Sequence, residues 1–325
     1  MKVPKIMDIP YKYVRKRIPP GLYIKLQSSI GRRKAYYSSD YYLNIAARYE
    51  KNIPIRNKTI LEIGPGNEIA VAILMVLLGA REVYLVDKIS GNPFASHGSS
   101  NDEEYAEKYL RIFQQSEQFH DREPAVSLPG DILAKIHQID SFFTAPELPE
   151  LMRDVKADCI VSNFVLEHIN DLETVFINMN RILRDDGVIY HQVDLSDHTY
   201  HVFTKYKSTI PLFTDNILLH LEYSDSTWSL LDDHKCIPMN RRTLPCYLDL
   251  CDKYGFRVDR LKTTLVDKSF HVHRDVVNSI APRYRTPEFL NLSSFELRAV
   301  RDKPGKDSHG ASADATVSEG KETNV

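Results

Sequence analysis

A glycine turn between two short apolar segments constrains the fold of this chain more than any other stretch. Residues 60–63, mostly apolar, run into the Gly-Pro-Gly of residues 64–66, as a buried parallel strand runs into its turn. Residues 69–78 are apolar on nearly every face, which indicates a helix buried against a sheet. A second apolar run, residues 83–86, ends at Asp87. This order predicts a parallel sheet that binds its ligand at the carboxyl ends of the strands.

The acids around the turn favour a cofactor without phosphate. Glu62 precedes the turn, and Glu68 lies where a bound phosphate would require free amides and positive potential. A dinucleotide fingerprint needs Gly or Ala where this chain has Ile69. Asp87 lies 21 residues after Gly66, the spacing of an acid that accepts hydrogen bonds from ribose hydroxyls. S-adenosylmethionine, with its adenosine, sulfonium and amino group, fits these acids.

With these residues the chain resembles the class I S-adenosylmethionine-dependent methyltransferases of type 11/23. Residues 134–142, 157–171 and 183–195 are similar to the third, fourth and fifth strands of that family. The resemblance implies an α/β fold with a doubly wound, mostly parallel seven-stranded sheet, an N-terminal helical extension and a lid insertion. It also implies cofactor contacts at the first four strand ends, namely Glu62, Gly64, Gly66, Asp87, Lys88, Asp140, Ser141, Asn163 and Phe164.

The rest of the chain divides by composition into three parts. Residues 1–55 form an extension with a predicted helix near its end, and residues 1–34 carry ten basic residues against one acid. That arm could meet an anionic acceptor, a membrane surface or RNA, or simply be solvated. Residues 56–301 form the methyltransferase domain, with an aromatic, irregular insertion at 196–240 on the acceptor side. Residues 302–325 are nearly free of apolar side chains and are predicted to be disordered.

Features of the sequence predict a cytoplasmic protein. No apolar run is long enough to span a membrane, and the basic start of the chain has no apolar segment of a signal peptide. The four cysteines have no C-x-x-C spacing, so they are interpreted as reduced thiols rather than as disulfides or zinc ligands.

Methyl transfer from a sulfonium requires an acceptor held in line and, for a hydroxyl acceptor, a group that takes its proton. The candidates lie near the ends of the fourth and fifth strands: His168, His191, Asp194 and His198. A structural role stays open for each of them. His168 could orient its turn, and the acid and histidine after the fifth strand could form loop hydrogen bonds.

Three further residues, Trp228, Arg241 and Arg242, are candidates for substrate binding. A single tryptophan is equally consistent with a core position, and the arginines with a solvated surface. No metal is predicted, because the fourth strand ends at Asn163 and no Asp-Asn pair follows the fifth.

The sequence favours oxygen as the methyl acceptor. An N-P-P-Y motif, which marks methylation of nitrogen in amides and bases, is absent after the fourth strand. Residues 191–198, 223–228 and 240–242 are similar to bacterial methyltransferases associated with surface glycans. O-methylation of a small molecule or glycan is therefore predicted, and nucleic acid is not the expected partner. Two alternatives remain: an RNA methyltransferase guided by the basic arm, and a non-catalytic protein that kept the fold.

Overall fold

The computed structural model describes most of the chain. The described residues are Tyr13, Arg17 and the ranges 38–66, 69–88, 102–152, 155–198, 216–231, 238–266, 270–302 and 318–319. None of the helices within these ranges combines the length and hydropathy needed to cross a membrane.

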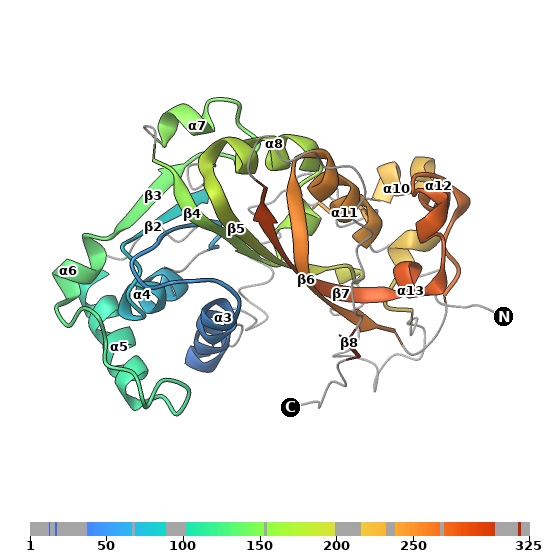
Figure 1. Ribbon diagram of the computed structural model, residues 1–325. Helices are drawn as coiled ribbons and strands as arrows, with labels where there is room; N and C mark the ends of the chain where they lie inside the picture. The colour runs from blue at the N-terminus through green and yellow to red at the C-terminus, as the bar shows by residue number, and fades with distance from the viewer. Residues whose placement is uncertain are drawn as a thin grey trace.

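One mixed sheet organises the molecule (Figure 1). Its strand order is β3-β2-β1-β4-β5-β7-β6-β8. The strands are β1 (Thr59–Ile63), β2 (Glu82–Asp87), β3 (Ile136–Asp140), β4 (Ala157–Asn163), β5 (Leu183–Asp194), β6 (Phe256–Leu265), β7 (Leu292–Arg301) and β8 (Ser318–Glu319). The first five are parallel, and β7 runs antiparallel between β5 and β6. The predicted doubly wound fold is therefore confirmed.

Helices cover both faces of the sheet (Figure 1). One face carries α3 (Ser39–Asn52), α4 (Ala70–Leu77), α5 (Asp102–Gln115) and α6 (Pro129–Leu133). The other carries α7 (Leu148–Leu151), α8 (Leu172–Ile182) and α11 (Leu244–Lys253). All eight residues of α4 are buried, because this helix is apolar all round and lies between the sheet and neighbouring helices.

The predicted helix of the N-terminal extension is α3, and it packs into the main core. Its N-cap is Ser38, whose side chain accepts a hydrogen bond from the backbone N–H of Tyr41. Its last residue, Asn52, receives hydrogen bonds from Arg298 to its carbonyl at 2.6 Å and from Arg260 to Oδ1 at 2.7 Å. The two arginines come from β7 and β6, so the end of this helix is bonded to the antiparallel part of the sheet.

The described part of the insertion at 196–240 includes regular elements that the sequence did not predict. It contains η3 (Leu219–Glu222) and α10 (Asp225–Leu231). Beside it lie the short elements α12 (Arg274–Asn278), η4 (Pro282–Tyr284) and α13 (Pro287–Leu290). Aromatic and apolar side chains of the insertion form a small core of their own, made of Leu219, Tyr223, Trp228, Leu231 and Met239. Apolar contacts within the insertion therefore override the irregular pattern of its sequence.

Several predictions fall on parts of the chain outside the described residues. They include most of the basic arm, residues 1–34, and much of the insertion, residues 199–215 and 232–237. The tail from residue 303 also lies outside, except for β8. The two residues of β8 pair in parallel with β6.

The turn after β1 lies directly against the turn after β4. Gly64 has φ +63°, and a Cβ placed on it would lie 2.7 Å from Cγ1 and 2.9 Å from Cγ2 of Val165. Its backbone N–H also donates to the carbonyl of Val86 at 2.9 Å. Only glycine combines this left-handed backbone with so close an approach.

Substitution of Gly64 by alanine is expected to destabilise the protein more than the same change at Gly66. Gly66 also has a positive φ, +76°, but a Cβ there would meet no described atom within 4 Å. Gly66→Ala should therefore lower the free energy of unfolding only by the cost of placing a Cβ on left-handed backbone, ~1–2 kcal/mol. Gly64→Ala should lower the free energy of unfolding by about 1–3 kcal/mol more, because its Cβ would also overpack against Val165. Denaturant unfolding of both variants measures the difference, and equal losses would contradict the proposed contact with Val165.

Candidate active site at the carboxyl ends of the parallel strands

A buried carboxylate, Glu62, stands at the end of β1. The side chain is 4 % exposed, and the hydroxyl of Tyr49 from α3 donates to its Oε1 at 3.4 Å. Among the described residues its Oε2 has no hydrogen-bond partner. Burial raises the pKa of Glu62 to about 7, although the bond from Tyr49 offsets part of this effect. The end of β1 thus holds a carboxyl group whose charge a cationic ligand would stabilise.

The next strand end places two acids side by side. Asp87 of β2 is in register with Asp140 of β3. Burial raises the pKa of Asp87, the backbone N–H groups of Gly66 and Lys88 partly offset it, and the Asp140 carboxylate raises it further. Lys88 Nζ lies 3.4 Å from Asp140 Oδ1. This edge can accept hydrogen bonds from a hydroxylated ligand lying over the open space beside Gly66.

Backbone hydrogen bonds hold two further predicted cofactor residues, Ser141 after β3 and Phe164 after β4. The N–H of Ser141, a residue only 6 % exposed, donates to the carbonyl of Asp87 at 3.2 Å. Phe164 has φ +57°, and its N–H donates to the carbonyl of Gln192 at 2.9 Å. Both predicted cofactor residues therefore lie at the same edge of the sheet as the glycine turn.

Asn163 at the end of β4 is held by the N-terminal helix. Arg48 Nη1 donates to its Oδ1 at 3.1 Å, and its Nδ2 donates to the hydroxyl of Tyr41 at 3.1 Å. Sequence reasoning missed Arg48, Tyr41 and Tyr49 as site residues. No local motif marks them, because their partners lie far away in the sequence.

The turn after β4 carries the second buried carboxylate, Glu167, within η2 (Leu166–His168). Its side chain is 2 % exposed, and among the described residues neither oxygen has a hydrogen-bond partner within 3.5 Å. Burial raises its pKa well above the usual value. The backbone N–H groups of Glu167 and Asp194 offset this only in part, and the Asp194 carboxylate adds to it. Sequence reasoning missed Glu167 as a chemical group.

The neighbouring His168 is fixed by one hydrogen bond. Its Nδ1 lies 2.7 Å from the carbonyl oxygen of Pro238, so Nδ1 carries the proton and Nε2 the lone pair. Burial, followed by the nearby His198, lowers its pKa to about 4, which leaves the ring neutral near pH 7. Asn240 braces the same turn, because its Nδ2 donates to the carbonyls of Leu166 at 2.7 Å and Ile169 at 2.8 Å.

The structure brings Asp194 and His198 together after β5. Nε2 of His198 lies 3.6 Å from Oδ2 of Asp194. The N–H and hydroxyl of Ser196 donate to Asp194 Oδ1 at 2.8 and 2.5 Å. Burial works to raise the pKa of Asp194, but the hydrogen bonds from His198 and Ser196 outweigh it and the pKa is lowered. Asp194 is therefore a stable anion beside an imidazole.

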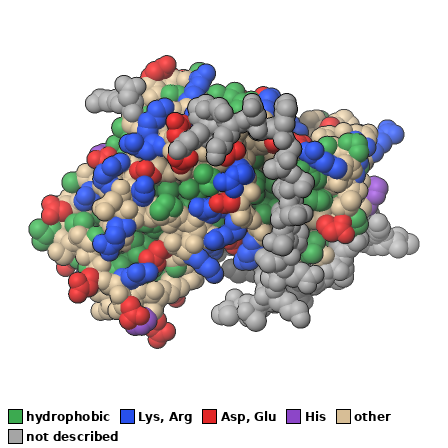
Figure 2. Space-filling view, viewed as in Figure 1, with side chains coloured by type: hydrophobic (Ala, Val, Ile, Leu, Met, Phe, Trp, Pro, Cys, Tyr) green, Lys and Arg blue, Asp and Glu red, His purple; other side chains and the backbone are tan. Residues whose placement is uncertain are grey.

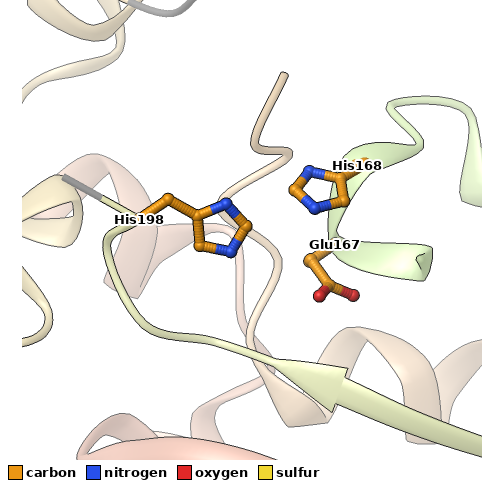
Figure 3. Close-up of side chains that lie close together, drawn as sticks. All are labelled: Glu167, His168 and His198. Atoms are coloured by element: carbon orange, nitrogen blue, oxygen red, sulfur yellow. The ribbon is translucent and has the colours of Figure 1, made fainter. Parts of the chain in front are cut away.

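The two imidazoles and the buried carboxylate converge (Figure 3). The rings of His168 and His198 lie edge to face, with centroids 4.8 Å apart. One potential ligand atom from each of Glu167, His168 and His198 lies within 4.8 Å of the other two. The structure thus places two of the predicted catalytic histidines together with a carboxylate at the ends of β4 and β5.

The remaining predicted catalytic residue, His191, lies apart from this group. It is 1 % exposed and shares the face of β5 that packs against α8 and α11. Its Nδ1 is 2.8 Å from the hydroxyl of Ser162 on β4. Burial lowers its pKa to about 3. A base must reach its substrate, so we do not include His191 in the proposed site.

Of the predicted substrate residues, Trp228 and Arg241 belong to the small core of the insertion. Trp228 is 9 % exposed, and its Nε1 donates to the carbonyl of Met239 at 3.3 Å. Arg241 is not solvated, since it is buried over the Trp228 ring and pairs with Asp225 at 3.0 Å. Arg242 is exposed, and its N–H donates to Asn240 Oδ1 at 2.9 Å.

A family model matches most of the chain. The chain matches the family model described as a methyltransferase domain over residues 33–261, which is more than half of its length. No curated protein matches it.

Solved structures similar to the chain include three methyltransferases. A putative S-adenosylmethionine dependent methyltransferase from Listeria monocytogenes is 14% identical, with 80% of this chain and 100% of that chain covered and a TM-score of 0.39. A putative sarcosine dimethylglycine methyltransferase from Galdieria sulphuraria is 14% identical, with 81% and 85% covered and a TM-score of 0.41. An S-adenosylmethionine dependent methyltransferase from Mesorhizobium loti is 12% identical, with 81% and 98% covered and a TM-score of 0.40.

The family match covers the glycine turn, the acids at the first three strand ends and the turn after β4. The chain belongs to the methyltransferase domain family, and it is a methyltransferase whose cofactor is S-adenosylmethionine.

Proposed function

We propose that this methyltransferase transfers the methyl group of S-adenosylmethionine to a hydroxyl oxygen of a small molecule or glycan. One observation carries the proposal: His198 pairs with Asp194 at the end of β5, beside the turn that follows β4. A histidine oriented by an ionised carboxylate is the group that a hydroxyl acceptor needs, because its proton must leave as the new C–O bond forms.

In this proposal the cofactor lies across the ends of β1, β2, β3 and β4. Asp87 accepts hydrogen bonds from the ribose hydroxyls, and Asp140 and Ser141 border the adenine. Glu62 faces the amino group of the methionine part. Its burial and its oxygen without a partner support this role, since a cationic group would stabilise the carboxylate. Asn163 and Phe164 border the cofactor next to the acceptor side.

The acceptor lies against the turn after β4 and the end of β5. In-line displacement breaks the sulfur–methyl bond as the hydroxyl oxygen attacks, and the electron pair of that bond stays on sulfur. With Nε2 of His198 directed toward Asp194, the other ring nitrogen takes the hydroxyl proton. Asp194 then stabilises the resulting imidazolium.

A small acceptor is proposed in preference to a nucleic acid. On the face shown in Figure 2, the described Lys and Arg side chains lie beside apolar and acidic side chains rather than in one basic stripe. Contact of the basic arm, residues 1–34, with an anionic surface stays a prediction.

An assay with radiolabelled S-adenosylmethionine tests the proposal. The acceptors are free sugars, lipid-linked glycans, phenols and total RNA at low and high salt. We expect label in a small molecule or glycan as a methyl ether that survives mild alkali. Label released by mild alkali would indicate a carboxyl ester, salt-sensitive labelling of RNA would favour the alternative enzyme, and no transfer together with no cofactor binding would favour a non-catalytic protein.

Replacement of His198 by alanine should lower turnover by about 10²–10⁴-fold, the usual contribution of a general base. The affinity for S-adenosylmethionine should stay within about twofold, because His198 lies on the acceptor side. His120→Ala is the matched control, since this exposed histidine pairs with Asp121 far from the site. Full activity of the His198 variant would mean that Asp194 or His168, and not His198, is the base.

Replacement of Asp87 by asparagine should weaken cofactor binding about ten- to a hundredfold, because hydrogen bonds to a charged acceptor contribute about 1.5–3 kcal/mol. Calorimetric titration with S-adenosylhomocysteine measures the loss, and Asp121→Asn on the exposed surface is the control. Unchanged affinity would mean that the ribose contacts another acid, with Asp140 the first to examine.

Cofactor affinity should also fall as the pH drops below about 7. Burial holds the pKa of Glu62 near 7, so the free protein carries a proton there at lower pH. A cationic amino group favours the carboxylate, hence binding at low pH releases that proton and weakens by up to about tenfold per pH unit.

Calorimetry in two buffers with different protonation enthalpies measures this proton release directly. The Glu62→Gln variant should bind more weakly but without the pH dependence. An affinity that stays constant for the unmodified protein from about pH 6 to pH 8 would remove Glu62 from the cofactor site.

A further inference from the structure

We propose that Glu167, His168 and His198 bind a divalent transition-metal ion, and that zinc is the ion their donor set fits best. The sequence predicted no metal, because the fourth strand ends at Asn163 and no Asp-Asn pair follows the fifth. The structure instead brings a carboxylate and two imidazoles together from η2 and the segment after β5 (Figure 3).

The first argument is the environment of Glu167. Its carboxylate is 2 % exposed, and within the described residues neither oxygen has a hydrogen-bond partner. An isolated buried carboxylate is costly unless it is paired or coordinates a metal. Among the described residues, the side chains that face it are those of Asp194, Tyr247 and two histidines, and none of these is a permanent cation. A bound cation would satisfy both oxygens.

The second argument is the orientation of His168. Its Nδ1 donates to the Pro238 carbonyl at 2.7 Å, which leaves Nε2 with its lone pair. Metal-binding histidines usually donate their other ring N–H to a carbonyl or carboxylate in this way. The turn itself is held by Asn240, whose N–H donates to the carbonyl of Glu167 at 2.9 Å. The two adjacent ligands are therefore fixed before a metal arrives.

The third argument is distance. Three atoms that lie within 4.8 Å of one another can all lie within about 2.8 Å of a common point, whereas zinc bonds to nitrogen and oxygen measure about 2.0–2.2 Å. A movement of less than about 1 Å by each side chain would complete coordination. His198 is partly exposed and can make the largest adjustment.

The donor set also selects the ion. Two imidazoles and one carboxylate suit zinc and its neighbours, whereas magnesium prefers oxygen ligands alone. Three protein ligands leave a fourth position open, as in catalytic zinc sites. Asp194, with its Oδ2 at 3.6 Å from Nε2 of His198, can orient that ring or approach the metal itself.

The role of the metal rests on the proposed function, because His198 is also the proposed base, but the binding of the metal does not rest on it. A metal there would lower the pKa of a bound hydroxyl. His198 would then act as a ligand, and as the base only in the metal-free protein. A substitution of Glu167 distinguishes the metal-bound mechanism from the metal-free one, because Glu167 takes part only in the metal-bound mechanism.

Zinc binding is tested on full-length protein made without a polyhistidine tag, stripped with a chelator and dialysed. Zn²⁺ is titrated against a chromophoric zinc indicator, without cofactor or acceptor. We expect one ion per chain with a dissociation constant at or below the micromolar range, and Mg²⁺ should not compete. Thermal unfolding should shift upward by several degrees with Zn²⁺.

Glu167→Gln and His198→Ala should each weaken Zn²⁺ binding at least about tenfold and remove the thermal shift. Glutamine keeps the size of the side chain and removes a buried charge, so the metal-free variant should remain folded. His120→Ala should bind Zn²⁺ as the unmodified protein does. Absence of saturable binding, or binding unchanged in both site variants, would overturn the proposal. Failure of methyl transfer with intact Zn²⁺ binding would instead count against the proposed function alone.

Discussion

The contact between Gly64 and Val165 is the interaction on which both halves of the site depend. It packs the backbone of the turn after β1 against the side chain that begins the turn after β4. The same glycine donates to the carbonyl of Val86, so β2 is held in the same arrangement. Phe164, next to Val165, is itself left-handed at φ +57°. Strained backbone of this kind persists where the surrounding structure fixes it, and here it sets the acids of the cofactor edge relative to Glu167 and His168.

The turn after β4 also depends on a segment about seventy residues later in the chain. The carbonyl of Pro238 accepts from His168, and Asn240 binds the backbone on both sides of Glu167. The end of the insertion is therefore part of the scaffold of the acceptor side and not only a cover over it. Its own small core around Trp228 and Arg241 holds that end in place, which gives these two residues a role without contact to substrate.

The sequence predicted those parts of the fold and site that local patterns encode. Apolar runs identified the parallel strands, and the spacing from Gly66 to Asp87 identified the second acid, because both follow from one strand–turn–helix unit. Tyr49 and Arg48 could not be found in this way, since their partners are remote in sequence. His191 is different, because a signal was present: alternation along β5 places it on the face of Ile189 and Val193, which packs against helices.

The two buried acids of the site, Glu62 at the end of β1 and Glu167 in the turn after β4, have different surroundings. Glu62 receives a hydrogen bond from Tyr49 and keeps one oxygen without a partner, so a single ammonium group is enough to complete its environment. Glu167 has no side-chain donor within hydrogen-bond distance among the described residues. Burial and then the Asp194 carboxylate raise its pKa, and the backbone N–H groups of Glu167 and Asp194 offset this only in part. The imidazoles of His168 and His198 can share a bound cation with Glu167. The different surroundings of the two acids support the two proposed ligands, an ammonium group at the end of β1 and a divalent ion at the turn after β4.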